Sequence, residues 1–523
     1  YSADLLPALA EHYEIDLILD QAELTDPWAA EHLPKRTVDW FRAHAHHFDR
    51  VLYHFGNSKF HQHMFDLLAD IPGMVVLHDF FLSGIQTHMG AENRTRALLE
   101  SHGAQALAAV ADGGDGGDGA GGAWTYPANL AVRQSATGVI VHSEWSRTLA
   151  DRWYGPGTAR AWSVIPLTRH PGDLDPGKRQ ASRDHLGLRD DELLICSFGD
   201  VGETKLSLEL MTAFVQAQAE LAGPVRLAFV GRIGGSYGDA LQQHRIDAGL
   251  QDQVMITGWA DEETYAHFLR AADIAVQLRT RSRGETSAAA LDALAWGLPL
   301  IVNAHGAMAE IDAAAACIIS DRFETKELAE ALVRLGSDKV LRAELSARAR
   351  ALIETLYNPG RCADLYHDAI ERYDAPPVNF ARTLAHRLAQ DADTPARLEA
   401  LAPALALTFP PAPRRPTLFV DVTQIATLDI RTGIQRVVRA IIVNLLENPP
   451  VDHAITPVVH TGQGIYCTAL RFLERIRAIA PAPLPEDPID PCPGDIFLGL
   501  DLVPIIEPAH AERLRSMQRQ GVR

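Results

Sequence analysis

The chain has 523 residues, with 67 acidic and 48 basic side chains and a formal net charge of −19. The length indicates two to four domains, and the acidic balance excludes a broad basic nucleic-acid footprint, although a few local cations suffice to bind a diphosphate. Five scattered cysteines without a CxxC pair exclude a disulfide framework or zinc cluster, and with no long apolar run or signal peptide we expect a cytoplasmic protein whose membrane contact, at the inner face, is peripheral.

The N-terminal third alternates between amphipathic and buried apolar segments. It predicts a helix over residues 1–13 and buried strands over 14–20, 49–57, 72–80 and 135–143. This alternation favours a parallel sheet with helices on both faces. A doubly wound lobe normally starts with a strand and a glycine turn before its first helix, so we expect the first lobe to be truncated.

Residues 90–126 have a different composition, because they contain the Gly/Asp tract of residues 111–123. Such a tract cannot bury enough apolar surface to order itself. We therefore expect a mobile surface insertion, which is a passive linker rather than a lid over a substrate.

A second α/β series follows a polar segment, residues 171–190, which we interpret as a hinge. Its predicted strands cover residues 193–200, 225–231, 253–258, 273–279 and 299–304. A Pro-rich stretch then precedes a new strand–loop–helix and a strand at 493–501. The predicted domains are 1–172, 173–375, a linker over 376–415, and a partial third α/β unit over 416–523.

Ligands of open parallel sheets bind beyond the carboxyl ends of the strands. The first lobe offers there Asn57, His78, Asp79, His142 and Ser143. The second offers Gly199, Asp200, Gly231, Arg232, Gly258, Arg279, Arg281, Arg283 and Asn303. The alternative for His78 is a local hydrogen bond without any catalytic role.

The segment FGDVGETK, residues 198–205, combines a glycine turn with a lysine near the next helix. Gly199 allows close backbone approach to a phosphate, and Lys205 supplies a cation near a helix start. Taken alone, a surface lysine in a strand–helix turn is the alternative.

The segment 278–303 carries arginines before Gly284, Glu285, Thr286 and Ser287, where a helix is predicted to start. Free N–H groups and hydroxyls there form a second diphosphate cradle. Asp292 lies seven residues after Glu285, two turns along the predicted helix, so both carboxylates face sugar or ribose hydroxyls. The alternative is that Glu285 only favours the helix start and Asp292 is solvated.

Together these segments resemble the retaining GT-B glycosyltransferases of family four, over about residues 1–375. HFGNSKFH, PGMVVLHDFFLSG and GVIVHSEWSR are similar to the acceptor half of its polysaccharide- and O-antigen-building branch. The segment LFVDVTQIATLDIRTGIQRVVRAIIVNLL also resembles the start of such an enzyme, with Thr432-Gly433-Ile434 as its glycine loop. The resemblance implies two doubly wound Rossmann-like lobes facing a cleft, followed by the start of a second unit.

The resemblance also implies residue roles. Lys205 corresponds to the lysine on the donor diphosphate, Glu285 to an acid on the donor sugar, Asp292 to a ribose ligand and His78 to the histidine near the reacting centre. Asn57, Asp79 and His142 fall on the acceptor side. The acids depart from the family pattern, since they are spaced E-x6-D and Asp replaces the second Glu. Asp200 stands near a usual phosphate-binding arginine, so Arg281 or Arg283 is expected to supply that charge.

The resulting hypothesis is a metal-independent, retaining hexosyltransferase without a cofactor. It uses a nucleotide diphosphate sugar, with GDP-mannose favoured, and extends a glycan or lipid-linked glycan of a cell-surface polysaccharide or O-antigen. Two rivals remain open: a GT-B-like nucleotide-sugar epimerase, for which Asp79 is the best extra acid, and a non-catalytic sugar-binding or scaffold module of a larger synthase.

Overall fold

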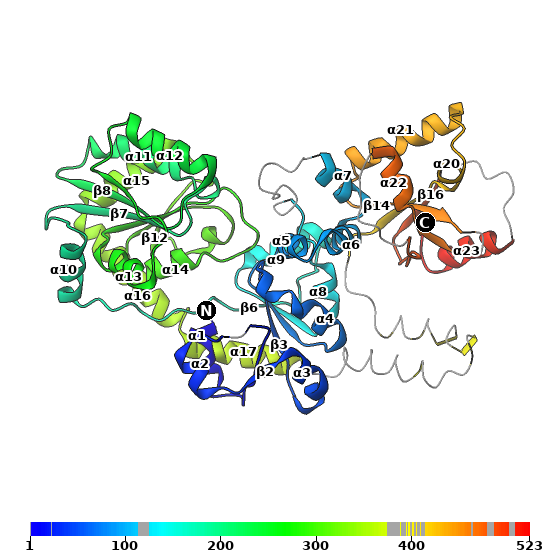
Figure 1. Cartoon of the computed structure of the whole chain (residues 1–523), viewed down its shortest axis with the longest axis horizontal. Helices are drawn as coiled ribbons and strands as arrows, with labels where there is room; N and C mark the ends of the chain where they lie inside the picture. Colours follow the sequence, from blue (N-terminus) through cyan, green and yellow to red (C-terminus); the bar gives the residue numbers. More distant parts are fainter. Residues whose placement is uncertain are drawn as a thin grey trace. The chain divides into compact units, whose positions relative to one another are not determined.

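A computed structural model describes most of the chain (Figure 1). The described residues are 2–21, 23–112, 125–373, 414–461, 464–477, 486–500 and 508–523, with a few single positions between 374 and 413. The chain divides into two units, which are described separately. The first comprises Tyr1–Thr37, Val141–Ser146 and Ser163–Arg372, and the second comprises Val38–Ile140, Arg147–Trp162 and Tyr373–Arg523.

A six-stranded parallel sheet organises the first unit, and we call residues 163–372 the six-stranded lobe. Its strands are β7 (Leu193–Phe198), β8 (Val225–Val230), β9 (Val254–Ile256), β10 (Ile274–Gln277), β11 (Leu300–Asn303) and β12 (Ala316–Ile319), in the order β12-β11-β10-β7-β8-β9. Five of these strands lie where the sequence predicts them, and β12 was not predicted. The strand order reverses between β7 and β10, which places the expected ligand crevice at their carboxyl ends.

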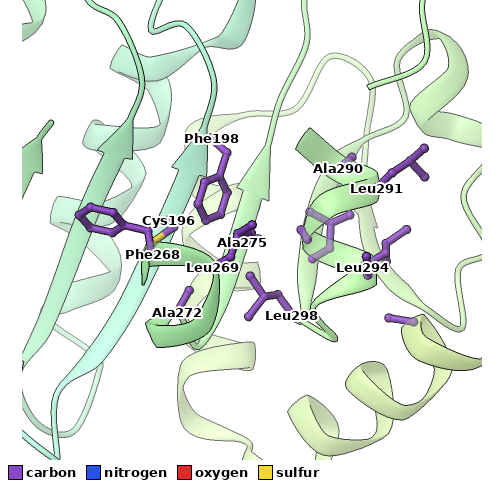
Figure 2. Packing of buried hydrophobic residues seen from close by; sticks show 14 of the residues in the cluster. Cys196, Phe198, Phe268, Leu269, Ala272, Ala275, Ala290, Leu291, Leu294 and Leu298 are labelled. Carbon is purple, nitrogen blue, oxygen red and sulfur yellow. The ribbon is translucent and has the colours of Figure 1, made fainter. Parts of the chain in front are cut away.

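Helices cover this sheet, which explains why its strands are continuous apolar runs. They are α10 (Pro176–His185), α11 (Ser207–Gln218), α12 (Gly235–Asp247), α13 (Glu262–Ala271), α14 (Ala288–Ala295), α15 (Thr325–Ser337), α16 (Lys339–Thr355) and α17 (Pro359–Tyr373). Figure 2 shows the packing beneath α13 and α14, where Phe198, Phe268 and Leu294 belong to one buried cluster. A second cluster includes Ile195, Phe214 and Leu332.

The polar segment 171–190, expected as a hinge, contains helix α10. Asp175 caps it by accepting from the backbone N–H of Gly177 at 2.7 Å, and Pro176 occupies the first turn. Arg179 and Arg183 then pair with Asp273 at 2.7 and 3.3 Å. The charged residues of the segment expected as a hinge therefore hold this helix against the start of β10.

The first unit also contains the N-terminal segment. Helix α1 (Ser2–Leu9) and strand β1 (Leu17–Leu19) occupy the predicted positions. After α2 (Pro27–His32), the chain forms β2 (Lys35–Thr37), which pairs in parallel with β1 and was not predicted. The short strand β6 (Ser163–Val164) precedes α10 and belongs to a separate four-stranded sheet.

The second unit begins with strand–helix alternation. Its elements are α3 (Val38–His44), β3 (Leu52–Phe55), α4 (His63–Asp70), β4 (Met74–Leu77), α5 (Ser83–His88), α8 (Leu130–Ser135), β5 (Gly138–Val141) and α9 (Glu144–Tyr154), with the ends of β5 and α9 crossing the unit boundaries. Strands β3 and β4 pair in parallel, with Phe55 opposite Leu77. The polar residues that follow these two strands therefore leave the same edge of the sheet.

The expectation of a mobile insertion is wrong for residues 91–112. They form α6 (Ala91–His102) and α7 (Ala104–Asp112), which we call the helical insertion. Leu98 and Leu107 are buried in one cluster with Val420, Ile442 and Leu473. The insertion is ordered because a distant part of the chain covers its apolar face. The rest of the Gly/Asp tract, residues 113–123, lies outside the described residues.

We call the described part of residues 414–523 the C-terminal lobe. Its sheet has the order β15-β14-β13-β16, from β13 (Thr417–Asp421), β14 (Ala454–His460), β15 (Tyr466–Thr468) and β16 (Ile496–Gly499), and β15 is antiparallel. Its helices are α20 (Thr423–Thr427), α21 (Gly433–Glu447), α22 (Leu470–Arg477) and α23 (Pro508–Arg519). Most of the predicted linker 376–415 lies outside the described residues.

The C-terminal lobe and the helical insertion share a core. Figure 1 shows α7 beside α21, both within the second unit. Gln105 of α7 accepts a hydrogen bond from the backbone N–H of Ile455 at 2.7 Å, and the backbone of Ile455 also lies against Gly103. The edge of the insertion is thus fixed to β14 as well as packed against it.

Candidate functional site

Two glycines form the floor of the site at the carboxyl ends of β7 and β8. Gly199 has a φ of +92°, in the region that favours glycine. A Cβ on Gly231 would collide with the carbonyl of Gly199, and a Cβ on Gly199 would collide with the ammonium of Lys205. The absence of side chains at both positions lets backbone and cation approach each other, and it gives a ligand access to the backbone.

Lys205 folds back over the end of β7. Its Nζ donates to the carbonyl oxygen of Phe198 at 2.8 Å. Burial, together with the nearby charge of Arg279, lowers the pKa of Lys205 to about 7, while Asp200 acts in the opposite direction. The side chain is thus a partly desolvated cation whose charge an anionic ligand would stabilise.

Arg279 follows β10 and is fixed by its neighbours. Its backbone N–H donates to Oδ1 of Asn303 at 2.8 Å, and Nδ2 of Asn303 returns a bond to the Arg279 carbonyl at 2.7 Å. Its guanidinium donates to Oγ of Ser287 at 3.3 Å. Burial lowers the pKa of Arg279, an effect that Glu285 opposes. Asn303 is fully buried, so it holds β10 and β11 together at the site.

The loop between β10 and α14 positions Glu285. Oε2 of Glu285 accepts from the backbone N–H of Arg283 at 2.6 Å, and Oγ of Ser282 accepts from the N–H of Gly284 at 3.1 Å. Oγ of Ser146 donates to the Gly284 carbonyl at 2.8 Å. The buried hydroxyl of Thr286 has no partner among the described residues. Because unpaired buried hydroxyls are costly, it is a natural contact for a ligand.

The predicted relation between Glu285 and Asp292 is wrong. Helix α14 begins at Ala288, with Ser287 as its cap, so Glu285 precedes the helix and does not share a face with Asp292. Asp292 accepts from Nε of Arg169 at 2.8 Å and from the hydroxyl of Tyr265 at 3.1 Å. It is therefore neither solvated nor placed two turns from Glu285. Its role as a ribose ligand stays a prediction.

The other predicted cations occupy more exposed positions. Asp200 forms an exposed pair with Arg232 at 3.0 Å. Arg281 is exposed, and Arg283 is partly buried in the loop before Gly284. These two arginines lie on the same loop as Glu285, and their contact with phosphate stays a prediction.

The predicted acceptor-side residues Asn57, His78 and Asp79 lie together in the second unit. Asp79 accepts from the backbone N–H of Asn57 at 2.9 Å, and Oδ1 of Asn57 accepts from the N–H of Ile85 at 2.7 Å. Nδ1 of His54 and Nε2 of His78 are 3.0 Å apart, and their rings stack. One ring nitrogen of this pair donates a proton to the other, which fixes how His78 is oriented. His54 carries no distinctive sequence signal beyond its position two residues before Gly56.

His142 and Ser143 lie in the first unit and are buried. Nδ1 of His142 contacts the Ile165 carbonyl at 2.8 Å, and burial lowers the pKa of the imidazole to about 4. Oγ of Ser143 contacts Oγ of Ser146 at 3.2 Å. These contacts give His142 a local structural role, and its place on the acceptor side stays a prediction.

Chemically, the end of β7 and the loop before α14 suit an anionic, hydroxyl-bearing ligand. Lys205 and Arg279 supply cations, Gly199 gives backbone access, and Glu285 and Thr286 can exchange hydrogen bonds with hydroxyls. Within the part of the chain that the structure describes, no group of three His, Cys, Asp or Glu side chains could hold a metal ion. None of the described helices is long and apolar enough to cross a membrane.

Arg279 and Asn303 were named only as strand-end residues in the sequence, and the structure brings them directly beside the loop of Glu285. The sequence could point to them only through their position after the apolar runs that form β10 and β11. Ser282 could be recognised less clearly, as a hydroxyl two residues before a glycine, which is typical of a tight turn. The sequence did not reveal Arg169, which reaches Asp292 from 123 residues away.

Comparison with known proteins shows that Lys205, Arg279 and Glu285 lie in a part of the chain that matches a family model. Residues 178–352 match the family model described as Glycosyl transferases group 1. A D-inositol 3-phosphate glycosyltransferase of Mycobacteroides abscessus is 36% identical over 147 residues, covering 27% of this chain and 31% of that protein. The same enzyme of Stackebrandtia nassauensis is 30% identical over 227 residues, covering 41% and 50%. The chain thus spans half or less of the length of these curated relatives.

Among solved structures, Anabaena HepE in complex with UDP and glucose is similar, with a TM-score of 0.52 and 16% identity over 71% of this chain and 96% of HepE. At that identity the likeness shows the fold alone. The chain therefore has the α/β fold with parallel sheets of the GT-B glycosyltransferases, and its residues 178–352 match the family model of group 1 glycosyl transferases.

Proposed function

We propose that this chain is a glycosyltransferase that binds a nucleotide diphosphate sugar at the carboxyl ends of β7 and β10. It transfers a hexosyl unit from this donor, with retention of anomeric configuration and without a metal. The observation that carries the proposal is the pair Lys205 and Arg279 beside the glycine floor, at the point where the strand order reverses. The match of residues 178–352 to group 1 glycosyl transferases supports it.

In this proposal the two cations stabilise the diphosphate as it leaves. Their orientation is set in advance, Lys205 by the Phe198 carbonyl and Arg279 by Asn303 and Ser287, so little reorganisation is needed during reaction. Glu285 accepts a hydrogen bond from a hydroxyl of the donor sugar, and Thr286 and Ser287 contact phosphate oxygens. Arg281, Arg283 and Gly284 complete the phosphate loop, and Asp292 contacts the ribose.

For the acceptor side we propose that His78 acts near the reacting carbon. Its contact with His54 at 3.0 Å supports a fixed ring orientation, and Asn57 and Asp79 stabilise the loop beside it. No carboxylate is assigned as a nucleophile, so the proposed route is a front-face displacement. Retention then follows from departure and attack on the same side of the sugar.

The favoured donor is GDP-mannose, and the proposed acceptor is a growing cell-surface polysaccharide or O-antigen at the cytoplasmic face of the membrane. The HepE structures contain UDP with glucose or UDP-glucose, so uridine donors belong in the same test.

The test is calorimetric binding of GDP, UDP and dTDP to the full chain of 523 residues. The full chain is needed because removing the C-terminal lobe would uncover the apolar face of the helical insertion. We expect one nucleotide to bind, with the affinity reduced at least tenfold in Lys205→Ala through loss of a charge-assisted contact. Lys326→Ala is the matched control, because Lys326 is exposed on α15 and pairs only with Glu330 in the described chain.

The enzymatic step is tested with the matching nucleotide sugar and a panel of glycan acceptors. NMR of the product gives the anomeric configuration, and an inverted product would contradict retention. Equal nucleotide affinity in Lys205→Ala and the folded wild type would contradict the donor site itself. Activity that needs added divalent metal would contradict the metal-independent mechanism.

A further inference from the structure

A cavity of about 400 Å³ lies in the C-terminal lobe between α20, α21 and α22. It is outside the region that matches the group 1 family, and it plays no part in the proposed donor site. Four arginines line it: Arg431, Arg436 and Arg439 from the start of α21 and the turn before it, and Arg475 from α22. Such a concentration of cations is unusual in a chain with a net charge of −19.

Among the described residues that line the cavity, Asp429 is the one carboxylate. It pairs with Arg439 and accepts a hydrogen bond from the backbone N–H of Arg431 at 3.3 Å. Arg475 donates to the Ala426 carbonyl at 2.5 Å, and among the described residues it has no carboxylate within 4.0 Å. Within the described residues, Arg431 and Arg436 have no carboxylate partner within 4.0 Å, so three of the four positive charges are unneutralised.

The cavity has a fixed frame. The Gln435 side chain accepts from the backbone N–H groups of Ile430 and Thr432 at 3.0 and 3.3 Å, and donates to the Leu428 carbonyl at 2.6 Å. Phe472 and Ile425 are buried and form an apolar wall. The turn that presents the arginines is thus held by a buried side chain rather than by exposed loop contacts.

Several guanidinium groups converging on one cavity are suited to phosphate oxygens, because each guanidinium offers paired N–H donors that match them. We propose that this cavity is a second anion site, separate from the donor site, that binds the diphosphate or phosphate group of a ligand whose remaining part lies against Phe472. The ligand is either a soluble phosphorylated compound or a lipid headgroup. Ile430 and Ile434 are exposed beside the cavity, so the test must also include a lipid headgroup.

The experiment uses the full chain carrying Lys205→Ala, so that anion binding at the proposed donor site is weakened. Inorganic pyrophosphate is titrated by calorimetry, and vesicles of phosphatidylcholine with and without phosphatidate are tested by sedimentation. We expect binding in one arm, weakened about tenfold or more by Arg436→Ala. Hydrogen exchange should show ligand protection in peptides covering residues 429–439 and 470–477.

Arg471→Ala is the matched control, because Arg471 is exposed on the same helix as Arg475 but does not line the cavity. It removes the same charge and should leave binding unchanged. Pyrophosphate binding that depends on Arg436 assigns a soluble ligand, and phosphatidate-dependent sedimentation that depends on Arg436 assigns a headgroup. The proposal is overturned if neither probe binds, or if Arg436→Ala and Arg471→Ala weaken binding equally. Neither result bears on nucleotide binding by the chain with Lys205 intact.

Discussion

The six-stranded lobe and the C-terminal lobe are both α/β, but they complete their cores in different ways. The first has two buried clusters built largely from residues of its own strands and helices. The second draws Leu98 and Leu107 from the helical insertion, more than 300 residues earlier in the chain. Their cations differ too: Lys205 is held in a partly desolvated position, whereas Arg431 and Arg436 are exposed. The difference separates a lobe that is self-contained from one that depends on a distant segment.

The largest expected effect tests the shared core. Leu107→Ala should destabilise the second unit by about 3 kcal/mol, because it removes a buried side chain and leaves a cavity. Native-state hydrogen exchange should then rise both in residues 91–112 and in residues 416–477.

The matched variant is Leu294→Ala in the six-stranded lobe, where Leu294 is fully buried. In Leu294→Ala, faster hydrogen exchange should be confined to the first unit. If Leu107→Ala left residues 416–477 as protected as in the wild type, the C-terminal lobe would not depend on the insertion.

A smaller loss is expected at the polar contact of the same interface. Gln105→Ala removes the acceptor for the Ile455 N–H, which leaves a buried donor unsatisfied at a cost of about 2 kcal/mol. Urea unfolding measures it. Gln216→Ala, at an exposed position of α11, should change stability by less than about 0.5 kcal/mol, and equal losses in the two variants would remove the special role of Gln105.

The two cation sites should respond differently to pH. The pKa of Lys205 is about 7, so its ammonium is charged below that pH and neutral above it. If donor binding needs the charge, affinity for a nucleotide diphosphate sugar should fall by up to about tenfold per pH unit above 7. Arginines keep their charge there, so pyrophosphate binding at the C-terminal cavity should show no such fall. Calorimetry at several pH values measures both affinities. If the two affinities changed with pH in the same way, the proposed difference between the two cation sites would be contradicted.

The smallest effect is a gain of stability. Burial depresses the pKa of Lys205 from its ordinary 10.5 to about 7, so the unfolded chain binds the extra proton between those values and wild-type stability rises with pH across this window. Lys205→Met should therefore be more stable than wild type by about 1 kcal/mol near pH 6, and the difference should vanish above pH 10.5. Thermal unfolding at pH 6 and 9 checks the sign, and a destabilised variant at pH 6 would refute it.

Local sequence was sufficient for much of the fold and less so for the site. Apolar runs bounded by turn residues predicted β7, β8, β10 and β11, because strands buried on both faces have little freedom in composition. The glycine after β7 and the lysine six residues later pointed to the same corner that the structure shows. These features depend on neighbours only a few residues apart.

The predictions that were wrong concern features that depend on distant partners or on the exact residue at which a helix starts. Helix α7 is short and Ala-rich and stands beside a Gly/Asp tract, and nothing local reveals that β14 covers it, 350 residues away. The start of α14 was placed three residues early because Glu285 and Ser287 both favour helix starts; the cap at Ser287 decides between them. Asp292 looked free because Arg169 is 123 residues distant.

The contact between Gln105 and Ile455 also has a consequence for how the chain is made. A ribosome adds about 5 to 20 residues per second, so the 350 residues between these partners take roughly 20 to 70 s to emerge. During that time the apolar face of α7 has no cover, while the six-stranded lobe can already close behind it. A nascent chain of this kind is a natural client for holding chaperones at residues 91–112, and slow codons in this interval would lengthen the exposure.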